Sequence, residues 1–216
     1  MRVYIMRHGE TIWNKERRLQ GQSGADLTET GVLLAEMTAE ALKDVPFDLC
    51  YSSPLTRARH TAEIMLRGRN IPLIFDDRIQ EIGFGIWEGK SIMPDKAEID
   101  LDEFKDFHDD PYNYQPPKGG ESIQDVINRA EDFWHDIIKK PDNKDRTILV
   151  STHGCCSRAL LHYVYEDKND YWHSGVPMNC AVSIVDVKDG KAVLTAEDQV
   201  YYPKKYYSNF YPSFDK

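Results

Sequence analysis

Two short apolar segments, Val3–Met6 and Thr147–Ser151, each run directly into a charged turn that contains a histidine and a glycine. The first segment leads into Arg7-His8-Gly9 and the second into Thr152-His153-Gly154. Segments this short, apolar and rich in β-branched residues predict buried strands. In open α/β sheets, ligands bind beyond the carboxyl ends of the strands. Both histidines are therefore expected at one ligand-binding edge of a sheet.

Helical patterns alternate with the strands along the chain. Thr28 is placed to cap a helix over 28–43, and Ser53-Pro54 to cap and open a helix that ends at Leu66. Ser122 and Asp125 resemble a capping box at the start of a later helix. Further strands are expected over 47–51 and 71–75, and a helix from the turn after 153 through 164. This alternation predicts an α/β fold, a three-layer αβα sandwich with a mostly parallel central sheet.

The length of 216 residues predicts a single domain over 1–216, in which two stretches stand apart. Residues 91–117 are polar, contain several prolines and interrupt the alternation, so we expect a lid-like insertion. Residues 201–216 are dense in aromatic side chains without a helical period. We interpret them as a C-terminal tail packed against the domain, because termini are ordered only when tied down. A contact between the two copies of a homodimer is the alternative.

The formal charge of −9 argues against a nucleic-acid partner, whose binding footprint would be basic. A local cationic pocket could still bind an anionic substrate. No apolar run approaches the ~18 residues of a membrane span, and the apolar stretch at the N-terminus is too short for a secretory signal. We therefore expect a cytoplasmic protein. The cysteines include no Cys-x-x-Cys pair, which predicts buried reduced thiols at all four positions: Cys50, Cys155, Cys156 and Cys180.

The two histidine turns belong to a longer series of short motifs. In chain order these are Arg7-His8-Gly9-Glu10-Thr11, Trp13-Asn14, Leu19-Gln20-Gly21, Leu27-Thr28-Glu29-Thr30-Gly31, the segment 52–62, Glu81, Gly83-Phe84-Gly85, Trp87-Glu88-Gly89 and Thr152-His153-Gly154. The series resembles the histidine phosphatase superfamily, in the branch that contains phosphoglycerate mutases and their phosphatase relatives. The resemblance covers residues 3–154 and continues more weakly through Met178-Asn179 and the strand after it.

These residue types suit phosphoryl transfer on physical grounds. A phosphoryl group in transit spreads negative charge over its oxygens, so catalysis depends mainly on positioning and on cationic stabilisation. Arg7 and Arg57 supply planar forks for bidentate phosphate contact. A histidine nucleophile must be unprotonated, and neighbouring cations disfavour its charged form.

The resemblance implies the individual roles. His8 is implied to be the nucleophile that becomes a phosphohistidine, and His153 the second histidine beside the phosphate. Glu81 is implied to be the general acid, which protonates the leaving alkoxide and later helps to activate water. Phosphate or substrate contacts are expected from Arg7, Arg57, Asn14, Gln20 and Gly21. No metal or cofactor is implied, and the expected partner is a small phosphomonoester.

Several of these roles have rivals in the sequence. Glu88 is close to Glu81 and also acidic, although the motif register favours Glu81. Arg59 lies next to the matched Arg57, and we interpret it as a solvated helix residue. The remaining histidines are expected to be structural or surface residues: His60, His108, His135, His162 and His173.

Two other phosphatase chemistries are disfavoured. A cysteine phosphatase needs five residues between its cysteine and arginine, whereas Arg158 follows Cys155 by only three positions. A metal phosphatase needs carboxylates and histidines at ligand spacing. The acidic run over 95–110 instead has the pattern of a solvated, irregular face.

The insertion decides between a hydrolase and a mutase. Residues 91–117 contain eight acidic residues, opposed only by Lys96 and Lys105. If the insertion overhangs the pocket, it should repel a second anionic group, which favours a phosphomonoester hydrolase over a phosphoglycerate mutase. The insertion's aromatic side chains could contact an apolar leaving group, but we expect a small core of their own. These side chains are Phe104, Phe107, Tyr112 and Tyr114.

Overall fold

The computed structural model describes residues 1–207 and contains a six-stranded sheet in the order β3-β2-β4-β1-β5-β6. Four neighbouring strands run parallel, and β5 and β6 are antiparallel additions at one side. The strands are β1 (Arg2–Arg7), β2 (Leu49–Ser52), β3 (Leu73–Phe75), β4 (Thr147–Thr152), β5 (Val182–Lys188) and β6 (Lys191–Gln199). The mostly parallel sheet is thus confirmed.

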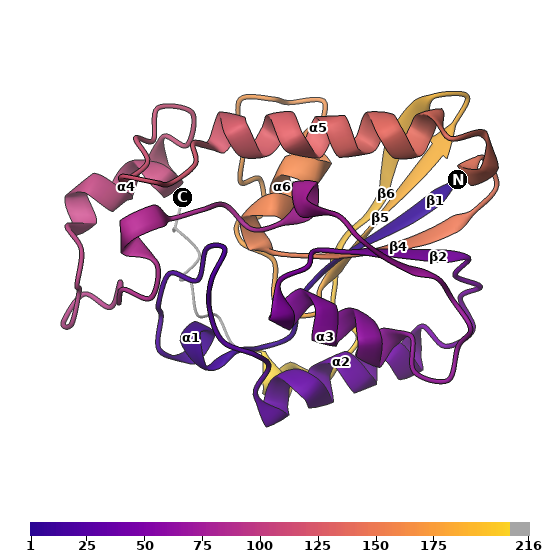
Figure 1. The fold of residues 1–216 in the computed structure, drawn as a ribbon, viewed down its shortest axis with the longest axis horizontal. Coiled ribbons are helices and arrows are strands. Elements are labelled where there is room, and N and C mark those ends of the chain that lie inside the picture. The colour runs from indigo at the N-terminus through magenta and orange to yellow at the C-terminus, as the bar shows by residue number, and fades with distance from the viewer. Residues whose placement is uncertain (208–216) are drawn as a thin grey trace.

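Helices cover both faces of this sheet, so the three-layer αβα architecture is also confirmed (Figure 1). Alternate residues of β1 supply the two cores: Val3 and Ile5 pack on one side, Tyr4 and Met6 on the other. The α2 and α3 helices cover the second side, and α5 and α6 the first. Their bounds are α2 (Glu29–Ala41), α3 (Thr56–Met65), α5 (Ile123–Lys139) and α6 (Gly154–His162).

The predicted helix starts are confirmed in two cases and wrong in one. Thr28 caps α2 by accepting the N–H of Gly31, and Ser122 and Asp125 form the predicted capping box of α5. The α3 helix, however, begins at Thr56 after Leu55, two residues later than predicted, and has no side-chain cap. Ser53 is not the helix cap: its hydroxyl accepts the N–H of Leu55, which precedes the helix, and also contacts His153.

Strand and helix ends differ from the predictions by one or two residues. The β2 strand begins at Leu49 rather than at 47, and β3 at Leu73 rather than at 71. The α6 helix ends at His162, before the predicted end at 164. All four cysteines are buried free thiols, as predicted.

The acidic run over 95–110 is solvated as predicted, but it is not irregular, because the insertion over 91–117 contains the helix α4 (Leu101–Asp109). This helix and the short α1 (Ile12–Lys15) lie beyond the carboxyl ends of the parallel strands (Figure 1). Phe104 and Phe107 are buried in the main core cluster together with Phe84 and Trp172, so the expectation of a separate small core was wrong. Tyr114 joins the same cluster, whereas Tyr112 is exposed.

The first part of the C-terminal stretch packs against the sheet domain. Tyr202 is buried beside Leu34 and Cys180, and its hydroxyl donates to the carbonyl oxygen of Asn179. The rest of the predicted aromatic tail, residues 208–216, lies outside the described residues.

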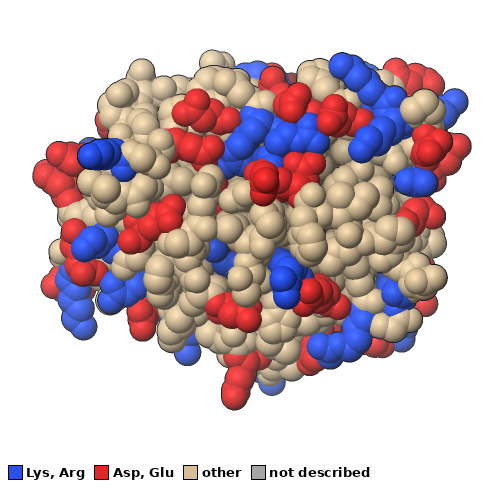
Figure 2. Space-filling view, in the orientation of Figure 1, with Lys and Arg blue, Asp and Glu red and all other residues tan. Residues whose placement is uncertain are grey.

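Charged groups of both signs lie side by side on the face that carries α5 (Figure 2). Arg78, for example, forms ion pairs with Asp76, Asp132 and Asp136. Among residues 1–207, no helix has the length and apolar character needed to cross a membrane.

Candidate active site

The register of β1 and β4 brings the two histidine turns together. Arg7 pairs with Thr152 across the parallel ladder, so His8 and His153 follow at the same edge of the sheet. Their ring centroids lie 5.2 Å apart. His8 is 2% exposed and His153 is fully buried. The sheet therefore places two histidines, 145 positions apart in the chain, in one buried site.

The His8 ring is held in one tautomer. Its Nδ1 lies 2.7 Å from the carbonyl oxygen of Gly9, which assigns the proton to Nδ1. Its Nε2 then carries the lone pair and accepts the Nε–H of Arg57 at 3.3 Å. Burial, together with the charges of Arg57 and Arg7, holds the pKa of His8 well below 6.5. His8 is consequently a neutral imidazole with its available lone pair on Nε2.

His153 is neutral for the same physical reasons. Burial lowers its pKa well below 6.5, and Arg57 and His8 lower it further. Its Nε2 hydrogen-bonds the hydroxyl of Ser53 at 2.8 Å, while its Nδ1 is buried and has no hydrogen-bond partner among the described residues. A buried ring nitrogen without a partner is costly unless a ligand satisfies it.

Two arginines flank His8, and main-chain carbonyl groups hold both. Arg57 donates through Nη1 to the carbonyl of Ser23 and through Nη2 to that of Gly21, each at 2.7 Å. Arg7 donates through Nη1 to the carbonyl of Pro177. Both guanidinium groups are almost completely buried. Since arginine stays charged in a protein, the site has two fixed positive charges beside the neutral imidazole of His8.

Gly21 acts through its backbone. Residues with a side chain rarely adopt its backbone φ of +54°, and a Cβ there would lie 2.1 Å from Oε1 of Glu88. Gln20 is buried and its Oε1 accepts the Thr11 hydroxyl at 2.9 Å. The structure thus places these two residues in the loop that holds Arg57, beside the site.

Asn14 is fixed next to His8. Its Oδ1 accepts the Thr11 N–H at 3.1 Å and the Nδ2–H of Asn179 at 3.3 Å, and Asn179 also donates to the His8 carbonyl at 3.0 Å. Within the described part of the chain, the Nδ2 of Asn14 is buried without a hydrogen-bond partner. An anion at His8 would satisfy this donor.

Glu81 is held at the N-terminus of α6. Its carboxylate accepts the N–H groups of Ile82 (3.0 Å), Cys156 (3.1 Å) and Cys155 (3.3 Å). A Cβ added at Gly154 would lie 3.7 Å from both Arg7 Nε and Glu81 Oε2. The tightest contact of that Cβ, at 2.9 Å, would be with Cγ1 of Val176, so Arg7 and Glu81 are neighbours of Gly154 but do not themselves require a glycine there.

The rival carboxylate, Glu88, has a different task. It accepts the main-chain N–H groups of Gln22 (2.9 Å), Ser23 (3.0 Å) and Phe84 (3.2 Å). These bonds fasten the loop that holds Arg57. Glu88 is thus engaged with the loop, whereas Glu81 lines a pocket together with Arg7.

A pocket opens beside Arg7 and Glu81, and its other walls are largely apolar. They are formed by Leu19, Ile82, Phe84, Phe104, Phe107, His108, Gly154, Cys155, Trp172 and Val176. His108 is therefore not an ordinary surface residue. Burial lowers its pKa to about 4, so it presents a neutral ring to the pocket at neutral pH.

Sequence reasoning missed Ser53, Asn179 and Thr61 as parts of the site. Ser53 was interpreted as a helix cap, and Asn179 was noticed only as part of a weak motif. Thr61 accepts the Gly9 N–H at 3.0 Å, and nothing in its local sequence indicates this contact. Arg59, by contrast, is exposed and paired with Glu63, as expected. No group of three or more metal-ligating side chains is found among residues 1–207.

Comparison with known proteins agrees with this fold. A model of the histidine phosphatase superfamily (branch 1) matches residues 3–198, so the chain belongs to that superfamily. A solved structure of Bacillus stearothermophilus YhfR is similar, with a TM-score of 0.85 and 34% identity over 92% of this chain and 97% of that one.

Two curated relatives are named as phosphatases. Phosphoserine phosphatase 1 of Hydrogenobacter thermophilus is 30% identical over 195 residues, which is 90% of each chain. A probable 2-carboxy-D-arabinitol-1-phosphatase of Arabidopsis thaliana is 33% identical over 186 residues, or 86% of this chain, which spans only 38% of that longer protein. The superfamily and these named phosphatase relatives are consistent with a phosphoric monoester hydrolase.

The buried neutral histidines predict how stability depends on pH. Below pH 6.5 the unfolded chain binds protons at these histidines and the folded chain does not, so the free energy of unfolding falls as the pH falls. Above about pH 6.5 neither state binds them and the contribution is constant. Each such histidine contributes about 1.4 kcal/mol per pH unit below that value.

We expect His153→Gln to reduce the slope of the free energy of unfolding against pH by about 1.4 kcal/mol per pH unit. The matched control is His135→Gln, at an exposed position. Urea unfolding at pH 7.5, 6.5 and 5.5 measures the slope. Equal slopes for wild type and His153→Gln would show that His153 is not buried in its neutral form.

Proposed function

We propose that this chain hydrolyses small phosphomonoesters without a metal, through a phosphohistidine formed on Nε2 of His8. The observation that carries the proposal is the neutral, buried His8, whose Nε2 lone pair lies against the Arg57 guanidinium group and whose pKa is also lowered by the charge of Arg7. A neutral imidazole is nucleophilic, and fixed cations stabilise the negative charge of a transferring phosphoryl group. The arginines supply the charge that a metal supplies in other phosphatases.

The reaction proceeds in two steps. In the first, His8 Nε2 attacks phosphorus, the bond from phosphorus to the ester oxygen breaks, and protonated Glu81 gives its proton to that oxygen. In the second, water attacks the phosphohistidine, Glu81 accepts the proton from water, and the phosphorus–nitrogen bond breaks. The step releases phosphate, returns His8 with its Nε2 lone pair free, and leaves Glu81 protonated again.

His153 and Asn14 fit the role of phosphate ligands. Each has a buried nitrogen that lacks a partner in the described residues, and both lie beside His8. A bound phosphoryl group offers acceptor oxygens to both nitrogens. In this proposal His153 carries its proton on Nδ1 when the phosphate is bound.

The walls of the pocket favour a hydrolase that accepts apolar leaving groups. Arg7 is the only lysine or arginine among the described residues that line the pocket, and the other walls are mainly aromatic and aliphatic. A second phosphate or carboxylate on the substrate would find no additional cation there. An aryl or alkyl leaving group would instead bury its surface against Phe104, Phe107 and Trp172.

The acidic side chains of the insertion do not act on the pocket in the way that the sequence predicts. All eight of its acidic side chains are exposed, and none lines the pocket. Repulsion by these carboxylates is therefore not what disfavours a bisphosphorylated substrate. The apolar wall that Phe104 and Phe107 of α4 form is what disfavours such a substrate.

Release of inorganic phosphate from a generic aryl phosphate in the presence of a chelator tests the reaction class. We expect metal-independent release that disappears in His8→Ala and is unchanged in Arg59→Ala, whose side chain is exposed. Conversion of 3-phosphoglycerate to 2-phosphoglycerate should be negligible. Efficient isomerisation with little phosphate release would overturn the proposal in favour of a mutase.

The substrate class is tested by Phe107→Ala. We expect kcat/KM for an aryl phosphate to fall about 10-fold relative to glycerol phosphate, because the apolar wall for the leaving group is lost. Phe133→Ala is the matched control, since Phe133 is equally buried but packs on Tyr51, away from the pocket. An unchanged ratio of the two substrates in Phe107→Ala would contradict an apolar leaving-group site.

A further inference from the structure

The segment that carries Glu81 has no regular secondary structure of its own. It runs between two short 3₁₀ helices, Asp77–Ile79 and Gly85–Trp87. The Gln80 N–H closes the first of these helices on the Asp77 carbonyl, but residues 81–83 belong to no helix or strand. The N–H groups of α6 hold the carboxylate of Glu81, whereas its main chain depends on contacts from elsewhere in the chain.

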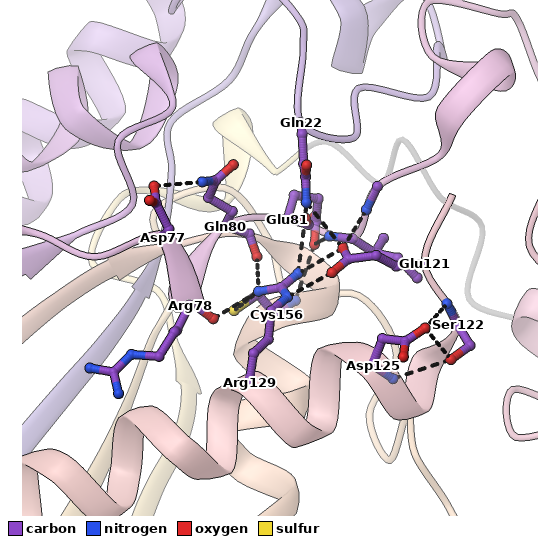
Figure 3. Close-up of polar contacts among 12 residues, drawn as sticks. Gln22, Asp77, Arg78, Gln80, Glu81, Glu121, Ser122, Asp125, Arg129 and Cys156 are labelled. Carbon is purple, nitrogen blue, oxygen red and sulfur yellow. Dashed lines mark hydrogen bonds and ion pairs between the residues drawn. The ribbon is translucent and has the colours of Figure 1, made fainter. Parts of the chain in front are cut away.

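Arg129 of α5 supplies one half of this support (Figure 3). Its Nη1 donates to the carbonyl oxygens of Arg78 at 2.8 Å and Gln80 at 2.7 Å, and its Nη2 to the carbonyl oxygen of Glu81 at 3.0 Å. The Arg129 side chain is only 16% exposed. One guanidinium group thus binds three main-chain carbonyl groups: that of Glu81, the implied general acid, and two from the residues just before it.

Glu121 supplies the other half. Its Oε1 accepts the Arg129 Nε–H at 3.0 Å, and its Oε2 accepts the Gly83 N–H at 2.8 Å. The Gln22 amide bridges the two, because its Nε2 donates to Glu121 Oε2 at 3.1 Å and to the Glu81 carbonyl at 3.4 Å. Hydrogen bonds consequently hold the main chain before Glu81, at Gln80, and after it, at Gly83.

We propose that Arg129 and Glu121 form a positioning pair that aims the Glu81 carboxylate at the ester oxygen of the substrate. This inference rests on the proposed role of Glu81 as the proton donor. Partly buried ion pairs contribute little to net stability compared with apolar side chains of similar size. The pair does, however, fix direction, since a guanidinium fork holds its acceptors at set angles.

The inference predicts an effect that depends on the leaving group. A phenolate with a low pKa departs without help, whereas an alkoxide needs a proton from Glu81 as the ester bond breaks. Misplacing Glu81 should therefore impair alkyl phosphates much more than aryl phosphates with a good leaving group. Since kcat/KM includes steps only through formation of the phosphoenzyme, it isolates this difference.

The decisive variants are Arg129→Lys, which keeps the charge but loses the fork, and Glu121→Gln. For each we expect kcat/KM for an alkyl phosphate to fall about 10- to 100-fold, with a change of about 2-fold or less for p-nitrophenyl phosphate. A steeper dependence of log kcat/KM on leaving-group pKa is the signature. An equal loss with both substrates would show a merely structural role and overturn the inference.

Arg69→Lys is the matched control, because Arg69 also donates to three main-chain carbonyl groups, those of Leu42, Lys43 and Val45. These carbonyls lie in the turn after α2, away from Glu81. We expect this variant to leave the leaving-group dependence unchanged. The same change in slope in Arg69→Lys as in Arg129→Lys would contradict the inference.

Glu81→Gln separates failure of the inference from failure of the proposed function. If Glu81→Gln steepens the leaving-group dependence and Arg129→Lys does not, the positioning role is wrong and the proton-donor role stands. If Glu81→Gln leaves the dependence unchanged, Glu81 is not the donor and both fail. Arg129→Lys added to Glu81→Gln should cause no further selective loss, since a missing acid cannot be misplaced.

Discussion

The pairing of β1 with β4 is the constraint on which the site depends. A parallel ladder aligns the carboxyl ends of neighbouring strands, and the register Arg7 to Thr152 leaves His8 and His153 with their ring centroids 5.2 Å apart. A shift by one residue would turn the side chains of a strand to the opposite face of the sheet. The apolar residues of β1 and β4, buried on both faces, fix this register.

Burial of two guanidinium groups is the main energetic cost of the site. Charged groups buried without partners are strongly destabilising. Carbonyl oxygens of irregular segments offset this cost: Gly21 and Ser23 hold Arg57, and Pro177 holds Arg7. The loops at the carboxyl edge are therefore parts of the site, and Glu88 stabilises one of them. Burial, together with the cations fixed in this way, lowers the pKa of His8 and keeps the ring neutral.

Local patterns in the sequence predicted the features that have local causes. Apolar runs predicted β1 and β4, and Thr28 and Ser122 predicted two helix starts. The motifs that resemble the superfamily singled out the residues now found together at the carboxyl edge.

Features with a distant partner could not be predicted this way. Ser53-Pro54 has the same sequence whether the hydroxyl caps a helix or binds His153, which lies 100 positions away. Phe104 and Phe107 lie in a run predicted to be irregular, and nothing near them in the sequence indicates the pocket that they line. Arg129 and Glu121 have no motif, because their partners are main-chain atoms.

The position of the phosphoryl group on the enzyme tests the central claim most directly. Glu81→Gln, mixed with an aryl phosphate whose leaving group departs without protonation, should accumulate the phosphoenzyme because water is no longer activated. Quenching at alkaline pH followed by ³¹P NMR and peptide mapping should locate the phosphate on Nε2 of His8. A phosphoryl group on Nδ1 of His8 or on another residue would contradict the account. A burst of phenolate from the same variant with no phosphoenzyme detected would also contradict it.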